Sequence, residues 1–410
     1  MKYSFQIGRI TIKLQSLLML VFAVFYILKM RRAFSGSSVQ GGIWNYIQLF
    51  FVALGFALFA IYIVRFINCS IVMSICIYSA LSLINGMIYL HMNQSEVFRY
   101  LLIPYAFCIL IIACVDGFYN DISSNFILTV TFYICAAMYI IPMLRNGGYS
   151  TKTGAVADVY YVLGLLPMML IWTKRFKIIP MSVCGIAVLV SGKRAGIFAF
   201  ALMIIGYYLL NIFVSENVLY QLTDLLKLAV IILLFIIVFN YLDSNFNNKL
   251  LSRMMRAIEE QDTAGRAERW DRIITAFREN NAVQWVFGNG NGAVSREFGG
   301  NAHNDYLEII YNFGVVAFLG YVTYSLTTVR ELLRMIFAKY EYAPQFLMTI
   351  IFSIIIAFFS FYVIDSTYIT SGMLCVGYMM VDFRKKHMPH HALIRDLDTT
   401  GNVLSERITA

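Results

Sequence analysis

Charged residues are scarce in this sequence. Asp, Glu, Lys and Arg together make up 13% of the 410 residues, whereas hydrophobic residues make up 60%. The mean hydropathy is +0.71, which is far above that of soluble domains of similar length. The composition therefore excludes a soluble globular protein. It predicts an all-α membrane protein that crosses the bilayer many times.

Motifs for disulfides, metals and nucleotides are also missing. The seven cysteines lie in or beside apolar segments without any Cys-x-x-Cys pair, at positions 69, 76, 108, 114, 135, 184 and 375. We therefore expect them to be packing residues. The glycine-rich stretch Gly288–Gly300 lacks the GxGxxG and Walker patterns, and we expect it to be a flexible loop.

Two further features bound the class of protein. The first apolar run, Leu17–Leu28, ends in basic residues without a small-residue cleavage site, so we expect this helix to be retained. The net charge of +9 would suit a nucleic-acid partner, but membrane proteins are usually basic because of their cytoplasmic loops. We therefore expect no nucleic acid.

Apolar runs long enough to cross roughly 30 Å of hydrocarbon predict about twelve transmembrane helices. They lie at about 16–30, 43–64, 69–90, 101–115, 125–144, 155–172, 178–191, 195–214, 225–241, 306–329, 346–363 and 366–382. The seventh and eighth are separated only by SGKRAG, which predicts either a tight hairpin or a broken element. The predicted organisation is helices one to nine in 1–241, a large soluble loop at 242–305, helices ten to twelve in 306–382 and a disordered tail at 383–410.

Basic residues in short loops give the expected orientation, with the amino terminus and the tail inside. The cytoplasmic side then holds Lys2, Arg9, Lys13, Lys174, Arg175, Lys177, Arg330, Arg334, Lys339, Arg384, Lys385 and Lys386. Two loops disagree, the basic residues at 29–32 and the acidic stretch at 116–121, so the orientation rests on the later helices. The loop 242–305 is expected to lie outside.

Within this loop, residues 263–277 predict a short amphipathic helix that begins at Gly265. Trp270, Ile273 and Phe277 recur at helical spacing and form one apolar face. We expect that face to lie on the membrane.

Arg194 is the first candidate functional residue, because with Lys193 it interrupts the apolar stretch 178–214. An arginine near the centre of a bilayer costs roughly 2.5 kcal/mol or more, so such a cation usually faces a polar cavity or a bound anion. The alternative is that both residues end a hairpin at the interface and extend their charges into water.

Arg266 and Arg269 are the next candidates, at helical spacing with Arg272. The planar guanidinium suits bidentate binding of phosphate oxygens, although an arginine-rich helix face is often simply solvated. His303 directly precedes an apolar segment. Its ordinary pKa lets a histidine accept a proton from a hydroxyl at physiological pH, and the alternative is a hydrogen-bonded interfacial histidine.

Three stretches, GRAERWDRIITAF, VFGNGNG and NAHNDYLEIIYNFGVVAF, occur in this order. Together they resemble the signature of the O-antigen polymerase and O-antigen ligase superfamily of bacterial membrane glycosyltransferases. The resemblance covers 263–318, and the helix number, the single late loop and the arginine of SGKRAG support it. It implies a glycan donor carried on undecaprenyl diphosphate in the bacterial inner membrane, with the site facing the periplasm.

The resemblance also implies roles for individual residues. Arg194 and Arg266 match arginines that bind the diphosphate, and His303 matches the histidine that activates the acceptor hydroxyl. Arg269, Asn304 and Tyr306 are expected to contact substrate, and Glu308 fits the same motif without an assigned role. No cofactor and no metal are expected, because the donor is already activated by its leaving group.

Three functions remain open from the sequence. The first is a polymerase of the Wzy type, which joins lipid-linked repeat units into O-antigen or capsular polysaccharide beside a flippase and a chain-length regulator. The second is a ligase, which moves finished glycan onto lipid A–core. We favour the polymerase, since such enzymes are numerous. The third, a flippase or other transporter, would be expected to show internal pseudo-repeats, and none is visible.

Overall fold

The computed structural model describes part of the chain, namely residues 4–7, 10–13, 122–145, 158–173, 176–245, 266–360, 362 and 366–387, with scattered positions at 19–30 and 84. The predicted helices at 43–64, 69–90 and 101–115 lie outside the described residues, apart from position 84. The described positions between 19 and 30 are helical, as predicted.

The predicted all-α membrane fold is confirmed, with helices at each predicted position from 125 onward. They are α6 (Ile122–Arg145), α7 (Val159–Trp172), α8 (Ile178–Ser191), α9 (Arg194–Val214), α10 (Val218–Asn245), α15 (Asp305–Phe337), α16 (Ala343–Phe359) and α17 (Ser366–His387). One exception was not predicted. The strands β1 (Ser4–Ile7) and β2 (Ile10–Lys13) pair as a short antiparallel hairpin near the amino terminus.

Within the described residues, four helices are long and apolar enough to cross a membrane, and they are Asn125–Arg145, Arg194–Val214, Val218–Tyr241 and Asp305–Phe337. The helices α7, α8 and α16 are apolar but shorter. The helix α7 lies at the centre of the bundle, where all but the last of its residues are buried. It packs against α6, α8, α9, α16 and α17. This position explains why its sequence is apolar on every face.

Two helices extend beyond their predicted ends because charged side chains do not stop a helix that leaves the bilayer. The helix α15 was predicted to end at 329 but continues to Phe337. Its last turns carry Glu331, which accepts a hydrogen bond from Arg334 Nη1 at 2.9 Å. Such i,i+3 pairs support a solvated helix end. Likewise, α17 continues to His387, past the predicted start of the tail at 383.

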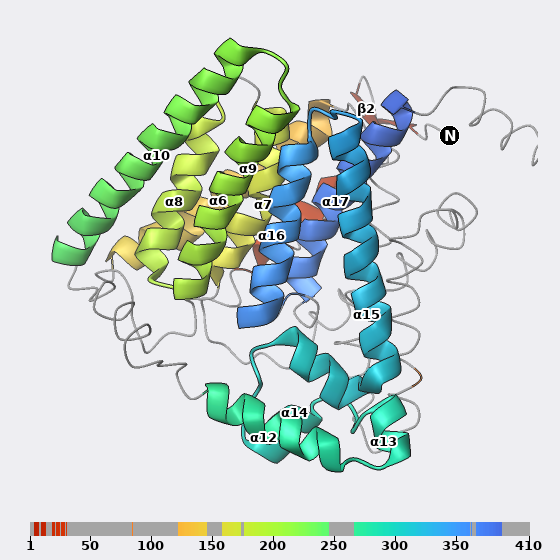
Figure 1. Cartoon of the computed structure of the whole chain (residues 1–410). Helices are drawn as coiled ribbons and strands as arrows, with labels where there is room; N and C mark the ends of the chain where they lie inside the picture. The colour runs from red at the N-terminus through yellow and green to blue at the C-terminus, as the bar shows by residue number, and fades with distance from the viewer. Residues whose placement is uncertain are drawn as a thin grey trace, which may run out of the picture.

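The short helices α12 (Arg266–Glu279), α13 (Ala282–Phe287) and α14 (Ala293–Phe298) form a separate unit at one end of the bundle, here called the loop unit (Figure 1). The helix α15 runs from this unit along the bundle and so belongs to both parts. The loop unit has its own small core, which includes Ile273, Phe277 and Tyr311.

The predicted amphipathic helix is confirmed as α12, which begins at Arg266 directly after Gly265. Its apolar face was predicted to lie on the membrane. Instead, Ile273 and Phe277 are buried against side chains of α14 and α15, and Trp270 packs at the edge of this cluster. The face is therefore covered by protein, because the loop unit folds back on the start of α15.

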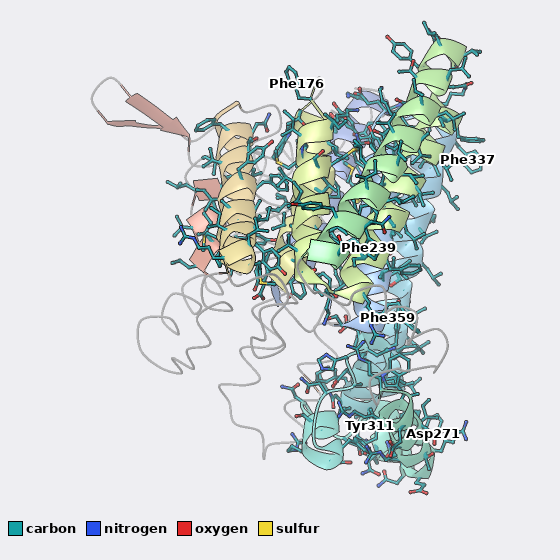
Figure 2. The ribbon with its side chains drawn as sticks, turned by 90° about the vertical axis from the view of Figure 1, so that its left-hand side faces the viewer. Phe176, Phe239, Asp271, Tyr311, Phe337 and Phe359 are labelled. Carbon is teal, nitrogen blue, oxygen red and sulfur yellow. The ribbon has the colours of Figure 1, made fainter. Side chains whose placement is uncertain are left out.

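The two ends of the helix bundle carry different polar residues. Phe359 marks the end of the bundle that meets the loop unit, and Phe176 and Phe337 mark the opposite end (Figure 2). The starts of α7, α9, α15 and α17 and the ends of α8 and α16 lie beside the loop unit. The opposite end carries Lys177 and Lys339, which lies in the α15–α16 turn.

Candidate functional site

Arg266, the first residue of α12, joins the loop unit to the bundle. Its Nη1 donates a hydrogen bond of 3.0 Å to the backbone oxygen of Phe359, the last residue of α16. A cation at the carboxyl end of a helix is favourable because the final carbonyls lack partners within the helix. The side chain is thereby placed at the junction of the two parts and not on an open helix face.

The surroundings of Arg266 are basic. Burial lowers its pKa, the nearby Tyr160 opposes this change, and the positive charges of Arg194 and Arg269 lower the pKa further. The three predicted arginines therefore act on one another electrostatically, although they belong to α9 and α12. Like charges held together in this way are costly unless an anion compensates them.

Arg194 reaches this cluster because α8 and α9 form a tight hairpin, which decides between the two predicted arrangements. Gly192 ends α8 in the left-handed conformation, with φ of 60°. A Cβ at Gly185 of α8 would lie 3.4 Å from the ring of Phe200 in α9, so the two helices run side by side. Arg194 is then the first residue of α9, at the end of the bundle beside the loop unit.

His303 lies between α14 and α15, with a backbone φ of 52° that is unusual for a residue other than glycine. Burial lowers its pKa from 6.5 to about 4, and the positive charges of Arg266, Lys193 and Arg269 contribute. The imidazole is therefore neutral at physiological pH and keeps a lone pair that can accept a proton. The same basic surroundings place His303 beside the arginine cluster.

Two side chains hold the residue before His303 from both sides. The backbone N–H of Ala302 donates to Glu308 Oε1 at 2.6 Å, and its carbonyl accepts a hydrogen bond of 2.8 Å from Trp270 Nε1. Asn312 Nδ2 donates to the other oxygen of Glu308 at 3.1 Å. Residues of α12 and α15 thus fix the backbone that carries the imidazole. The sequence resemblance left Glu308 without a role, and the structure gives it this one.

The other predicted contact residues have partners within the protein. Arg269 Nη1 donates to the backbone oxygen of Asn301 at 2.7 Å. The Asn304 side chain accepts a hydrogen bond of 3.1 Å from Leu307 N and caps the start of α15. The ring of Tyr306 packs against Tyr321, with 5.6 Å between centroids. These residues shape the site whether or not they also touch a substrate.

The glycine-rich stretch was predicted to be a flexible loop, but close backbone contacts hold part of it in place. Gly288 N–H closes α13, and Gly290 N–H donates to the Asn312 carbonyl at 2.9 Å. Gly288 and Gly314 both have positive φ, and Gly314 kinks α15. A Cβ at Gly314 would lie 2.2 Å from the oxygen of Val286. Only glycine allows this approach of α13 to α15.

An open apolar groove of about 680 Å³ lies next to the basic cluster. Trp270 and Ile274 of α12 line one side, Phe358 and Phe359 of α16 line another, and Phe198 of α9 completes it. The rings of Trp270 and Phe358 meet edge to face at 5.6 Å between centroids. The side chains of Asn304 and Tyr306 also reach the groove. The cations and a long apolar surface therefore share one end of the bundle.

The sequence analysis identified the charged residues of this site but missed their neighbours. Nothing in the pattern pointed to Tyr160, or to the Phe359 carbonyl that receives Arg266, because both come from apolar segments distant in sequence. Among the residues that the structure describes, no group of three or more His, Cys, Asp or Glu side chains could hold a metal ion.

Comparison with known proteins gives one family match. No curated protein matches the chain. Residues 179–322 match the family described as O-antigen ligase, and this range contains α8, α9, the loop unit and most of α15. It thus includes Arg194, Arg266 and His303. The match supports the resemblance of residues 179–322 to the O-antigen ligase and polymerase superfamily.

Proposed function

We propose that the protein is a glycosyltransferase that takes its donor from undecaprenyl diphosphate and joins oligosaccharide repeat units into O-antigen or capsular polysaccharide. The observation that carries the proposal is the meeting of a basic cluster, a neutral histidine and an apolar groove at one end of the bundle. A polyprenyl diphosphate has the matching parts, an anionic head and a long apolar chain. The family match over residues 179–322 supports the same reaction class.

In this reaction Arg194 and Arg266 hold the diphosphate, and Arg269 adds positive charge beside them. The Nε of Arg269 is buried without a hydrogen-bond partner within the described residues, so it keeps a donor for an anion. Donors placed where charge develops stabilise the leaving group. The negative charge of the substrate also offsets the repulsion among the three arginines.

His303 accepts the proton of the attacking sugar hydroxyl. The hydroxyl oxygen forms a bond to the anomeric carbon of the donor, and the bond from that carbon to the phosphate oxygen breaks. Its electron pair goes to the diphosphate, and the proton goes to the imidazole. The lowered pKa of His303 keeps the ring neutral and supports this role. The hydrogen bonds of Glu308 and Trp270 to Ala302 support a fixed position for the ring.

The same arrangement suits a ligase, and the matched family bears that name. We place the polymerase first because the loop unit is small and its apolar side chains are largely used in its own core and against the bundle. In the described part of the loop, residues 266–305, this leaves little surface for a large lipid A acceptor. In either case the site lies at the outer face of the inner membrane, where lipid-linked glycans are assembled.

Deletion of the gene in a host that makes lipopolysaccharide distinguishes the two functions. If the protein is a polymerase, long chains disappear from both lipopolysaccharide and the carrier-linked pool, and the core carries at most one repeat unit. If it is a ligase, long chains accumulate on the carrier and the core is bare. Electrophoresis of lipopolysaccharide, read beside the carrier-linked glycans, gives the answer, and the second pattern would refute our first choice.

A further inference from the structure

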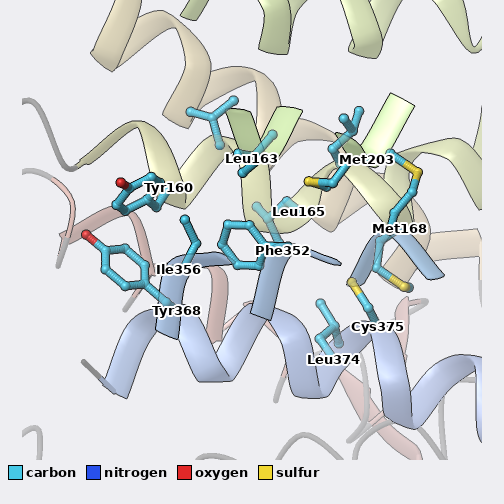
Figure 3. Close-up of a cluster of buried hydrophobic side chains, with 14 of the residues drawn as sticks. Tyr160, Leu163, Leu165, Met168, Met203, Phe352, Ile356, Tyr368, Leu374 and Cys375 are labelled. Atoms are coloured by element: carbon cyan, nitrogen blue, oxygen red, sulfur yellow. The ribbon is translucent and has the colours of Figure 1, made fainter. Parts of the chain in front are cut away.

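Tyr160 occupies a buried position beside the arginine cluster. It is the second residue of α7, and its side chain is fully buried. Its ring meets the ring of Tyr368 edge to face at 5.4 Å between centroids. Both hydroxyls lie at the same end of the buried cluster (Figure 3). The ring also lies against the first turn of α9, since a Cβ at Gly196 would be 3.6 Å from Tyr160 Cε1.

The hydroxyl of Tyr160 has no hydrogen-bond partner among the residues that the structure describes. A buried polar group without a partner costs about 1–3 kcal/mol, so such groups are rare in folded proteins. Tyr340 at the opposite end of the bundle illustrates the usual case, because its buried hydroxyl donates to the Asp382 carboxylate. The Tyr160 hydroxyl is therefore a candidate hydrogen-bond donor to a ligand.

The neighbours of this hydroxyl indicate the class of ligand. Tyr160 is close enough to Arg266 to act on its charge, and Gly196 places it beside the turn that begins with Arg194. A neutral O–H donor adds a hydrogen bond for an anion without adding to the repulsion among the arginines. The ligand that suits two guanidinium groups and a phenol hydroxyl is a phosphate-type anion.

We propose that the Tyr160 hydroxyl donates a hydrogen bond to a phosphate oxygen of the lipid-linked diphosphate held by Arg194 and Arg266. The inference rests on the proposed function and adds a substrate-binding residue to it. In the structure Tyr160 is fully buried and Arg266 Nη1 donates to the Phe359 carbonyl. When the diphosphate draws the guanidinium away from that carbonyl, the phenol oxygen comes within reach of the anion.

Tyr160→Phe tests this contact because it removes the oxygen alone. The probe is farnesyl diphosphate, with farnesol as the control that lacks the anion, bound to the full-length protein in nanodiscs. A hydrogen bond to a charged group is expected to account for about a 10-fold to 100-fold change in affinity. We therefore expect weaker binding of farnesyl diphosphate by that factor, unchanged binding of farnesol and a melting temperature that is equal or higher.

Tyr207→Phe is the matched control. Tyr207 is buried at the opposite end of α9, and its hydroxyl oxygen accepts a hydrogen bond from Lys177 Nζ at 2.9 Å. This variant should lose stability and keep its affinity for the probe. Arg266→Lys in the same assay shows how much affinity for farnesyl diphosphate is lost when one diphosphate contact is weakened.

Each outcome is decisive. If Arg266→Lys weakens binding while Tyr160→Phe stays within twofold of the unchanged protein, the inference fails and the proposed function stands. If Tyr160→Phe lowers the melting temperature, the hydroxyl has a partner within the fold and the inference also fails. If the unchanged protein binds farnesyl diphosphate no better than farnesol, the proposed function fails and the inference fails with it.

Discussion

At the scale of single residues, the proposed function requires the planar guanidinium of arginine and not only its positive charge. Lysine keeps the positive charge but cannot bind two oxygens in one plane. We expect Arg194→Lys and Arg266→Lys each to lower kcat/KM for chain extension by at least about 10-fold, the equivalent of about 1.4 kcal/mol. Extension of a radiolabelled lipid-linked acceptor by the purified protein measures the effect.

Arg272→Lys is the control for this pair, because Arg272 lies on the same helix as Arg266 but on its exposed side. It should retain normal activity. Near-normal activity of both site variants would instead mean that Arg194 and Arg266 are ordinary interfacial charges.

The lowered pKa of His303 gives a prediction about pH. A pKa of about 4 leaves the imidazole neutral at pH values well below the ordinary histidine pKa. The acid limb of kcat/KM, which reports the free enzyme, should therefore lie nearer 4 than 6.5. The limb of kcat should lie at higher pH, because a bound diphosphate raises the pKa of the imidazole. Rates measured across the pH range of the folded protein test both limbs.

The lowered pKa of His303 also makes the free energy of unfolding depend on pH. Unfolded histidine has a pKa near 6.5, so between that value and about 4 the unfolded chain binds a proton that folded His303 does not bind. The free energy of unfolding therefore falls as the pH is lowered through this window. His303→Ala removes that part of the acid sensitivity and should abolish activity at every pH. Polymer made by the alanine variant would remove His303 from the mechanism.

At the scale of elements, the contact between α13 and the kink of α15 depends on Gly314. Alanine at a φ of 81° and a ψ of 176°, a region almost restricted to glycine, costs about 1–3 kcal/mol from its conformation alone. In addition, its Cβ would lie 2.2 Å from the Val286 oxygen. We expect Gly314→Ala to separate the loop unit from α15, with loss of activity and a lower melting temperature.

Gly299→Ala provides the comparison for this prediction. Gly299 also has a positive φ, of 68°, but a Cβ there would meet no atom within 4 Å. This variant should show only the conformational cost of about 1–2 kcal/mol. Equal effects of the two substitutions would mean that the close approach at Gly314 does not matter.

The sequence predicted where the helices lie better than it predicted which residues pack against them. Long apolar runs located the helices from 125 onward, because hydrophobic length is a local property. The apolar face of α12 was also predicted, but the protein that covers it comes from α14 and α15. The glycine contacts were missed because they depend on which backbone approaches, and the unpaired hydroxyl of Tyr160 was missed because burial depends on the whole bundle.

At the scale of the whole molecule, the two ends of the bundle should lie on opposite sides of the membrane. Cysteine introduced at Arg278, on the exposed face of α12, should react with an impermeant maleimide in intact spheroplasts. Cysteine introduced at Arg334, exposed at the far end of α15, should react only after permeabilisation. The described native cysteines, Cys135, Cys184 and Cys375, are buried and should contribute little background.

The reverse labelling pattern would place the loop unit in the cytoplasm. The arginines and His303 would then face the side on which lipid-linked units are made and not the side on which they are polymerised. That result would contradict the proposed function as a whole, whatever the effects of single substitutions.

If the proposed function is correct, the open apolar groove beside α12 also affects how the lipid-linked substrate reaches the site. If the polyprenyl chain lies in the groove during the reaction, the substrate does not have to leave the lipid phase. Collisions then take place in two dimensions, and the quantity that sets the rate is the mole fraction of carrier lipid among all amphiphiles. In mixed micelles, added detergent at constant molar substrate should slow the enzyme by dilution of the surface, whereas a larger volume of buffer should not.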